Sequence, residues 1–107
     1  MYTRPSINIC CSESIDRECI NEILWGIEEE GLPYFLKFVP SQEVVKGNYV
    51  SGTLEVGIGI SENGDALLTT RKYDKKYIQK ANVFEGKEKL RDLGSNGARL
   101  VKGLPLR

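Results

Sequence analysis

The chain contains no histidine, and it has only one tryptophan and one methionine among its 107 residues. Without histidine, the commonest general base of enzymes is missing, and Ser-His-Asp and Cys-His nucleophilic sites are excluded. A zinc centre is also hard to build, because zinc takes about four ligands and the chain offers only three cysteines and no imidazole. Any catalysis by this chain would therefore have to use carboxylates, lysine or tyrosine.

The cysteines are too few for a disulfide framework. Their number is odd, and Cys10 and Cys11 are adjacent in a segment that has the pattern of a buried strand. We therefore interpret these two, together with Cys19, as small buried apolar side chains.

The chain also lacks an excess of charge of either sign, because fifteen basic side chains balance fifteen acidic ones. Nucleic acids and anionic membranes attract clustered positive charge, so we expect neither as a partner. No apolar run is long enough for a signal sequence or a membrane span, and we expect a cytoplasmic protein. Residues 1–107 have the length and composition of a single globular domain with one core.

Strand and helix patterns alternate along the chain. Apolar runs predict strands at residues 7–11, 34–39, 54–60, 66–70 and 78–84. Helical spacing predicts helices at about residues 15–30, from Ser41 to near Gly47, and at residues 87–102. Asn63-Gly64 between two apolar runs predicts a hairpin. We therefore predict an α/β three-layer sandwich, with helices on both faces of a mixed, mostly parallel five-stranded sheet that has one antiparallel strand.

The first predicted helix has an unusual outer face. Its apolar stripe consists of Ile15, Cys19, Ile20, Ile23, Leu24 and Ile27. At about 100° per residue, Glu18, Glu22, Trp25 and Glu29 fall together on the opposite face. Exposed large aromatics are enriched at protein interfaces, so this face is a candidate partner interface. The alternative is that Trp25 covers the edge of the domain or a neighbouring loop.

Three carboxylates, Glu28, Glu29 and Glu30, occupy the last turn of that helix, where the helix dipole favours cations instead. One of them could meet a basic side chain or a divalent metal of a partner, and a solvated charge run is the alternative. Adjacent helical residues point about 100° apart, so the triplet cannot converge on one substrate as the acid and base of an enzyme.

The last predicted helix carries Arg91, Arg99 and Lys102 on its outer face, which the helix dipole explains without a binding role. Gly94 and Gly97 lie on its inner side, where a missing side chain allows close backbone approach.

Three segments carry a resemblance to a known family. Residues 24–34, read as LWGIEEEGLPY, resemble the "GIEEEGIPF" motif of the small subunits of diol and glycerol dehydratase reactivases. Residues 93–107 resemble the C-terminal "NAARLVKGIPFR" motif of that family, and residues 56–60 resemble its "VGIG" strand. The segments follow the family order and span nearly the whole chain. Two departures are Gly97-Ala98 in place of Ala-Ala, and Pro105-Leu106 in place of Pro-Phe.

The resemblance implies a non-catalytic small subunit of a chaperone-like, ATP-dependent factor that reactivates adenosylcobalamin-dependent diol or glycerol dehydratase. Its partners would be a large, actin-like ATPase subunit and the dehydratase. The small subunit would exchange places with the medium subunit of the dehydratase, so that damaged cobalamin is released. The resemblance leaves open which substrate the dehydratase uses and whether the system sits in a bacterial microcompartment.

The resemblance also assigns roles to residues of the first helix. The middle glutamate of the family triplet, which corresponds to Glu29, is expected to ligate Mg²⁺ or Ca²⁺ held by the large subunit. We expect no catalytic residue and no cofactor bound by the chain alone. The predicted partner interface consists of Glu18, Glu22, Trp25, Glu28 and Glu29.

The second interpretation is a medium, structural subunit of the dehydratase itself. That subunit is expected to carry an additional N-terminal extension, whereas this sequence starts almost directly on its first strand. Because Trp25 is expected to be exposed, a homo-oligomer of the isolated chain is also compatible with the sequence.

Overall fold

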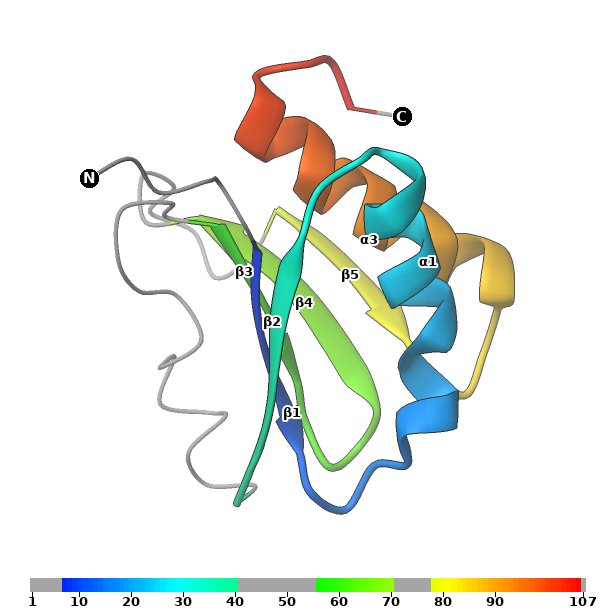
Figure 1. The fold of residues 1–107 in the computed structure, drawn as a ribbon. Helices are drawn as coiled ribbons and strands as arrows, with labels where there is room; N and C mark the ends of the chain where they lie inside the picture. Colours follow the sequence, from blue (N-terminus) through cyan, green and yellow to red (C-terminus); the bar gives the residue numbers. More distant parts are fainter. Residues whose placement is uncertain (1–6, 41–55, 71–77, 107) are drawn as a thin grey trace, which may run out of the picture.

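The computed structural model describes residues 7–40, 56–70 and 78–106 (Figure 1). Its elements are, in chain order, β1 (Ile7–Ser12), the 3-10 turn η1 (Arg17–Ile20), α1 (Asn21–Glu29), β2 (Tyr34–Val39), β3 (Val56–Ile60), β4 (Asp65–Thr70), β5 (Gln79–Asn82) and α3 (Lys87–Lys102). The alternation of strands and helices confirms the predicted α/β class.

The sheet has five strands in the order β2-β1-β3-β4-β5. β1 runs parallel to both of its neighbours, β2 and β3, whereas β4 runs antiparallel to both β3 and β5. The predicted hairpin at Asn63-Gly64 joins β3 to β4. Gly64 has φ +87°, a conformation that favours glycine, and its N–H donates to the carbonyl of Ser61.

The predicted single antiparallel strand is confirmed, because β4 alone runs against the other four strands. The prediction that the sheet is mostly parallel is wrong when neighbouring strands are compared, because two of the four pairings are antiparallel. The reason is the connection between β4 and β5. Parallel neighbours need a crossover of roughly a dozen residues or more. Only the short segment between Thr70 and Gln79 joins these two strands, which therefore pair as antiparallel neighbours.

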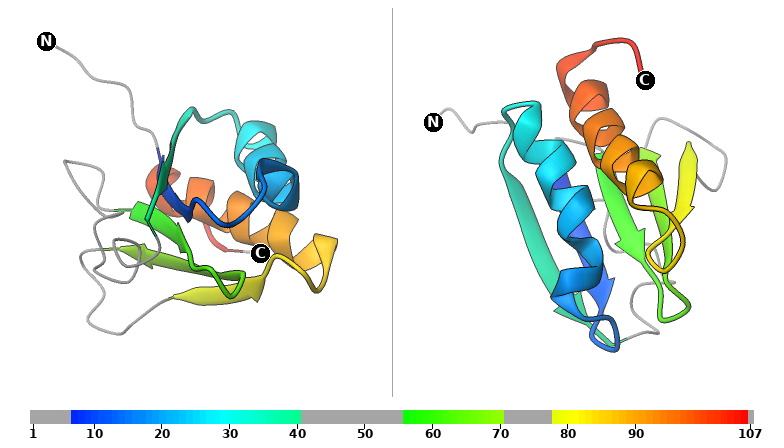
Figure 2. Two further views of the ribbon diagram at one scale, coloured as in Figure 1. Left: turned by 90° about the horizontal axis from the view of Figure 1, so that it is seen from below. Right: turned by 90° about the vertical axis from the view of Figure 1, so that its right-hand side faces the viewer.

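The two described helices, α1 and α3, lie side by side on one face of the sheet (Figure 2). The prediction of helices on both faces is therefore not confirmed by the described residues. The helix predicted from Ser41 falls outside them, and the third layer stays a prediction.

The hydrophobic core fills the space between this helix pair and the sheet. Alternate residues of each strand point toward the helices, as the period of two in a strand requires. Fully buried members of the core are Ile7, Ile9 and Cys11 of β1, Ile58 and Ile60 of β3, Leu68 of β4, Ile20 of η1, Ile23 and Ile27 of α1, and Leu90 and Leu93 of α3. Each buried Leu or Ile side chain stabilises the fold by about 1.5–3 kcal/mol.

Two glycines allow α1 and α3 to approach closely. A methyl group on Gly94 of α3 would overlap the carbonyl oxygen of Ile23. A methyl group on Gly26 of α1 would overlap the carbonyl oxygen of Arg91. Ser95 reinforces the crossing, because its hydroxyl donates to the carbonyl of Gly26 at 3.3 Å. The close approach predicted at Gly94 is confirmed, and it brings the basic residues of α3 beside the acidic residues of α1.

Candidate functional site

Arg91 of α3 contacts three residues on the outer face of α1. Its Nε donates a hydrogen bond to Glu22 Oε1 at 3.0 Å, and its Nη1 lies 2.9 Å from Glu29 Oε2. Its guanidinium carbon lies 5.6 Å from the centroid of the Trp25 ring, within the range of a cation–π contact. We call these four residues, Glu22, Trp25, Glu29 and Arg91, the Arg91 cluster.

The spacing of the cluster follows from helix geometry. Residues three or four apart share a face of an α-helix, so Glu22, Trp25 and Glu29 form one row along α1. The hydrogen bond with Glu29, the largest cause, and that with Glu22 outweigh desolvation and raise the pKa of Arg91 above its ordinary value. The cluster is therefore a permanently charged cation between two carboxylates, on an aromatic ring.

The members of the cluster differ in their access to solvent. The side chain of Glu22 is 19% exposed and that of Arg91 is 32% exposed, whereas that of Glu29 is 53% exposed. Trp25 is 46% exposed as a residue, which confirms that it points away from the core. Glu29 is therefore the carboxylate of the cluster that another molecule can reach most easily.

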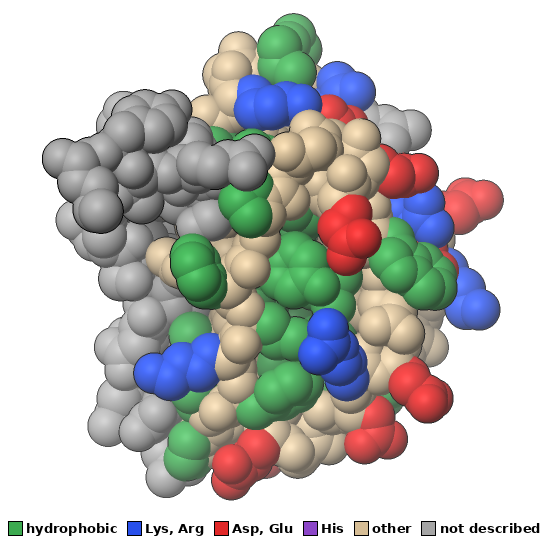
Figure 3. Space-filling model, in the orientation of Figure 1, with side chains coloured by type: hydrophobic (Ala, Val, Ile, Leu, Met, Phe, Trp, Pro, Cys, Tyr) green, Lys and Arg blue, Asp and Glu red, His purple; other side chains and the backbone are tan. Residues whose placement is uncertain are grey.

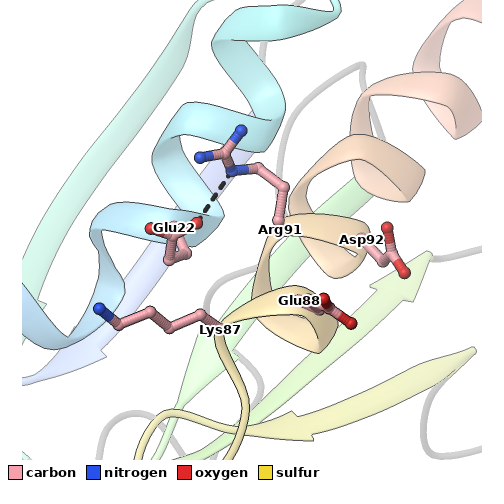
Figure 4. A pocket seen from close by; sticks show the side chains of 5 residues that line it. All are labelled: Glu22, Lys87, Glu88, Arg91 and Asp92. Atoms are coloured by element: carbon pink, nitrogen blue, oxygen red, sulfur yellow. Dashed lines mark hydrogen bonds and ion pairs between the residues drawn. The ribbon is translucent and has the colours of Figure 1, made fainter.

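A surface hollow of about 470 Å³ adjoins the cluster. It is lined by Glu22 of α1 and by four residues from the first part of α3, namely Lys87, Glu88, Arg91 and Asp92. In Figure 4, Lys87 and Arg91 extend toward α1, whereas Glu88 and Asp92 point away from it. The lining carries both signs of charge, so the hollow by itself selects neither cations nor anions.

Glu30 belongs to a second, separate cluster at the other end of the helix pair. Arg99 Nε donates to Glu30 Oε2 at 3.2 Å, and Lys102 Nζ lies 3.4 Å from Glu30 Oε1. Lys102 also donates to the carbonyl oxygen of Glu30 at 2.6 Å. Desolvation of the carboxyl group opposes its ionisation, but the hydrogen bonds and charge of Arg99, then of Lys102, outweigh it and lower the pKa of Glu30.

The three glutamates of the triplet therefore have three different partners. The hydroxyl of Tyr34 on β2 donates to Glu28 Oε1 at 3.4 Å, Glu29 pairs with Arg91, and Glu30 pairs with the end of α3. This divergence agrees with the expectation that the triplet does not converge on one point. The last turn of α1 has no basic residue of its own, and the basic residues Arg91, Arg99 and Lys102 of α3 supply the missing positive charge. From the sequence alone, the helix dipole of α3 was a sufficient explanation for these residues.

The structure brings together three of the five predicted interface residues, Glu22, Trp25 and Glu29. Glu28 turns toward β2 instead. Glu18 is exposed in η1, which is a 3-10 turn and advances about 120° per residue, so the α-helical wheel does not place it correctly. No recorded contact within the described part of the chain joins Glu18 to the Arg91 cluster.

The sequence alone does not reveal the exposed apolar surface along β2. Figure 3 shows a hydrophobic patch between β2 and α1. Leu32, Tyr34 and Leu36 pack against the core and are partly buried. Phe38 is exposed on the same side of β2 as Tyr34 and Leu36, whereas Phe35 is exposed on the opposite side. This surface exists because β2 is an edge strand, and strand order within a sheet cannot be deduced from the strand patterns.

No metal centre is complete within the described residues. Residues 7–40, 56–70 and 78–106 contain no group of three or more histidine, cysteine, aspartate or glutamate side chains that could hold an ion. A cation at Glu29 would therefore need further ligands from outside this part of the chain. None of the helices in this part is long and apolar enough to cross a membrane.

Comparison with known proteins gives consistent results for sequence and fold. The sequence model of the family described as "Dehydratase medium subunit" matches residues 4–107. A propanediol dehydratase-reactivating factor small subunit from Citrobacter freundii is 34% identical, over 80% of this chain and 77% of that protein. A diol dehydratase-reactivating factor small subunit from Klebsiella michiganensis is also 34% identical, over 99% of this chain and 86% of that protein.

Two solved structures share the fold. A chain of a glycerol dehydratase reactivase superimposes with a TM-score of 0.81 at 29% identity, over 96% of both chains. A chain of a diol dehydratase-reactivating factor complexed with ADP and Mg²⁺ gives a TM-score of 0.81 at 28% identity, over 100% of this chain and 99% of that one. The similarity therefore extends over nearly the whole chain.

Proposed function

This chain belongs to the dehydratase medium subunit family, as a small subunit of a dehydratase-reactivating factor, and we propose that it serves that factor as a non-catalytic docking subunit. The observation that carries the proposal is the similarity to a reactivating-factor small subunit over 99% of this chain. The absence of histidine and the divergence of Glu28, Glu29 and Glu30 both support a role without catalysis.

The partner of this subunit is the large, ATP-hydrolysing subunit of the factor. A related factor was solved with ADP and Mg²⁺, and we assign nucleotide binding in the present factor to its large subunit. The contribution of this chain to docking is the exposed face of α1, with Glu29 as a ligand to a divalent cation that the large subunit holds. The high exposure of Glu29 and the hard oxygen donors of a carboxylate support this role.

The second partner is the dehydratase. The sequence family of this chain takes its name from the medium subunit of dehydratases, which supports a shared fold for the two subunits. A shared fold would let this chain take the place of the medium subunit, loosen the enzyme and release damaged cobalamin. The alternative role as a structural medium subunit is disfavoured by the relatives, which are described as reactivating-factor small subunits.

The proposal is tested by titrating this chain into the cognate large subunit in Mg²⁺ and in EDTA, with isothermal calorimetry as the measurement. We expect Mg²⁺ to strengthen association of the wild-type chain. In Mg²⁺, Glu29→Gln should weaken association at least about tenfold. Mutation of a residue that only hydrogen-bonds to a metal ligand already lowers metal affinity by about tenfold or more, and loss of a ligand itself should cost at least as much. Glu88→Gln is the matched control, since Glu88 lines the neighbouring hollow without belonging to the Arg91 cluster.

Two results would contradict the proposal at different points. Equal association in Mg²⁺ and EDTA, for both the wild type and Glu29→Gln, would exclude the metal contact. No association of the wild-type chain with the large subunit under either condition would exclude docking itself.

A further inference from the structure

Glu29, which we propose as a ligand to the divalent cation of the large subunit, already forms an ion pair within this chain. Arg91 Nη1 lies 2.9 Å from Glu29 Oε2, at the distance of a charge-assisted hydrogen bond. We propose that Arg91 is an internal competitor that holds Glu29 in the free subunit and must release it when a divalent cation binds. This inference rests on the proposed role of Glu29 and adds a residue that sets its affinity.

The two ion pairs of Arg91 use different nitrogens. Nε bonds to Glu22, whereas Nη1 bonds to Glu29. A guanidinium group holds its five N–H donors in a fixed plane, so one carboxylate can leave while the other stays bound. Glu22 can therefore keep Arg91 in place when Glu29 turns away.

Burial decides which carboxylate leaves. The side chain of Glu22 is 19% exposed, and that of Glu29 is 53% exposed. Although the hydrogen bond with Glu29 is the largest cause of the raised pKa of Arg91, Glu29 is the more exposed carboxylate. Water screens its pair more strongly and can hydrate it once it leaves, so the outer pair breaks at the lower cost. After Glu29 leaves, Arg91 remains paired with Glu22 and stacked on Trp25, and no charge is left without a partner.

Charge decides what can displace Arg91. A sodium or potassium ion carries the same single charge as the guanidinium and offers no directed hydrogen bond in exchange. A divalent cation carries twice that charge and binds carboxylate oxygens directly, which favours the exchange. Arg91 therefore restricts Glu29 to a doubly charged ion that other ligands already hold in place.

Removal of Arg91 should make association with the large subunit more sensitive to Mg²⁺. Arg91→Met keeps an unbranched apolar side chain against Trp25 and removes the charge. We expect the Mg²⁺ concentration for half-maximal association to fall about two- to fivefold, which corresponds to the usual strength of an exposed ion pair. Arg91→Gln removes the same charge, so it should shift the midpoint in the same direction and serves if the methionine variant does not fold.

Arg99→Met is the matched control. It breaks the analogous pair between α3 and Glu30, so it should leave the Mg²⁺ midpoint unchanged. In a chain that already carries Glu29→Gln, the further change Arg91→Met should have no effect on the response to Mg²⁺. Arg91→Met acts by releasing the Glu29 carboxylate, and that carboxylate is absent in the double variant.

The two proposals fail in different ways. If wild-type association needs both Mg²⁺ and Glu29, but Arg91→Met leaves the midpoint unchanged or raises it, the competitor role is wrong and the proposed function stands. If association is unchanged by the removal of Mg²⁺ and also by Glu29→Gln, the proposed metal contact is wrong, and the competitor role of Arg91 is wrong with it.

Discussion

The close approach of the two helices at Gly94 predicts that Gly94→Ala destabilises the chain, although alanine is the better helix former. The added methyl group would overlap the carbonyl oxygen of Ile23 and lie 2.9 Å from the carbonyl carbon of that residue. Carbon atoms pack at about 3.5–4.0 Å, so the helices must separate by roughly 1 Å. Because Ile23 contributes backbone atoms here, no rotamer change can relieve the overlap.

The size of the effect follows from three terms. Overpacking of this kind typically costs about 1–3 kcal/mol. Separation of the helices also stretches the 3.3 Å hydrogen bond from Ser95 to Gly26, which is worth about 1 kcal/mol. The higher helix propensity of alanine stabilises the variant by about 1 kcal/mol and offsets part of these two losses. We therefore expect a net loss of about 1–3 kcal/mol, and a melting temperature at least about 4 °C lower for a domain of this size.

Thermal unfolding followed by circular dichroism measures this change, with Gly97→Ala as the control on the same helix. A methyl group on Gly97 would meet only side-chain methyl ends, Leu68 Cδ1 at 3.3 Å and Ile7 Cδ1 at 3.4 Å. These ends can move, so we expect Gly97→Ala to stay within about 1 kcal/mol of the wild type. A Gly94→Ala variant as stable as Gly97→Ala would refute the role that we assign to the helix crossing.

Three further measurements test the core and the charged clusters. Because the pKa of Glu30 is lowered in the folded chain, its carboxylate stabilises the fold at neutral pH, and this contribution is lost as the pH falls through the folded value. Glu30→Gln should therefore lower the melting temperature at neutral pH and have little effect below that value, and an equal loss at both would contradict the pairing. Burial, then the charges of Cys19 and Cys10, raises the pKa of the Cys11 thiol to about 12. Cys19 is only partly buried, which corrects the expectation of a buried side chain, so iodoacetamide should label Cys19 in the folded chain and Cys11 only after unfolding, as mass spectrometry can show. Leu68→Ala should cost about 2–5 kcal/mol in urea unfolding, because Leu68 is fully buried between the sheet and α3, and a cost below 1 kcal/mol would place it outside the core.

The features that local sequence determines were predicted well. The bounds of β2 and α3 coincide with their predicted ranges, because hydrophobic period and helix-ending glycines act over a few residues. The hairpin at Asn63-Gly64 and the outward position of Trp25 are confirmed for the same reason. Each of these features depends on neighbours within one or two turns of the chain.

Most features that depend on packing between distant segments were not predicted, although the close approach at Gly94 was. The ion pair of Arg91 with Glu22 joins residues 69 positions apart, and it exists because Gly26 and Gly94 let the helices approach closely. A helical wheel shows Arg91 only as an outward charge, since it contains no information about the neighbouring helix. The single antiparallel strand was predicted correctly, but the balance of parallel and antiparallel pairings was not, because the pairing of β4 with β5 is set by a short connection and not by the pattern of either strand.

The central claim is that this chain is a functional subunit of a reactivating factor and not a permanent subunit of the dehydratase. Its most direct test is the release of damaged cobalamin from inactivated dehydratase, followed by absorbance after gel filtration, with the large subunit, ATP and Mg²⁺ present. We predict release when this chain is added and little release without it. Equal release with and without this chain would contradict the claim.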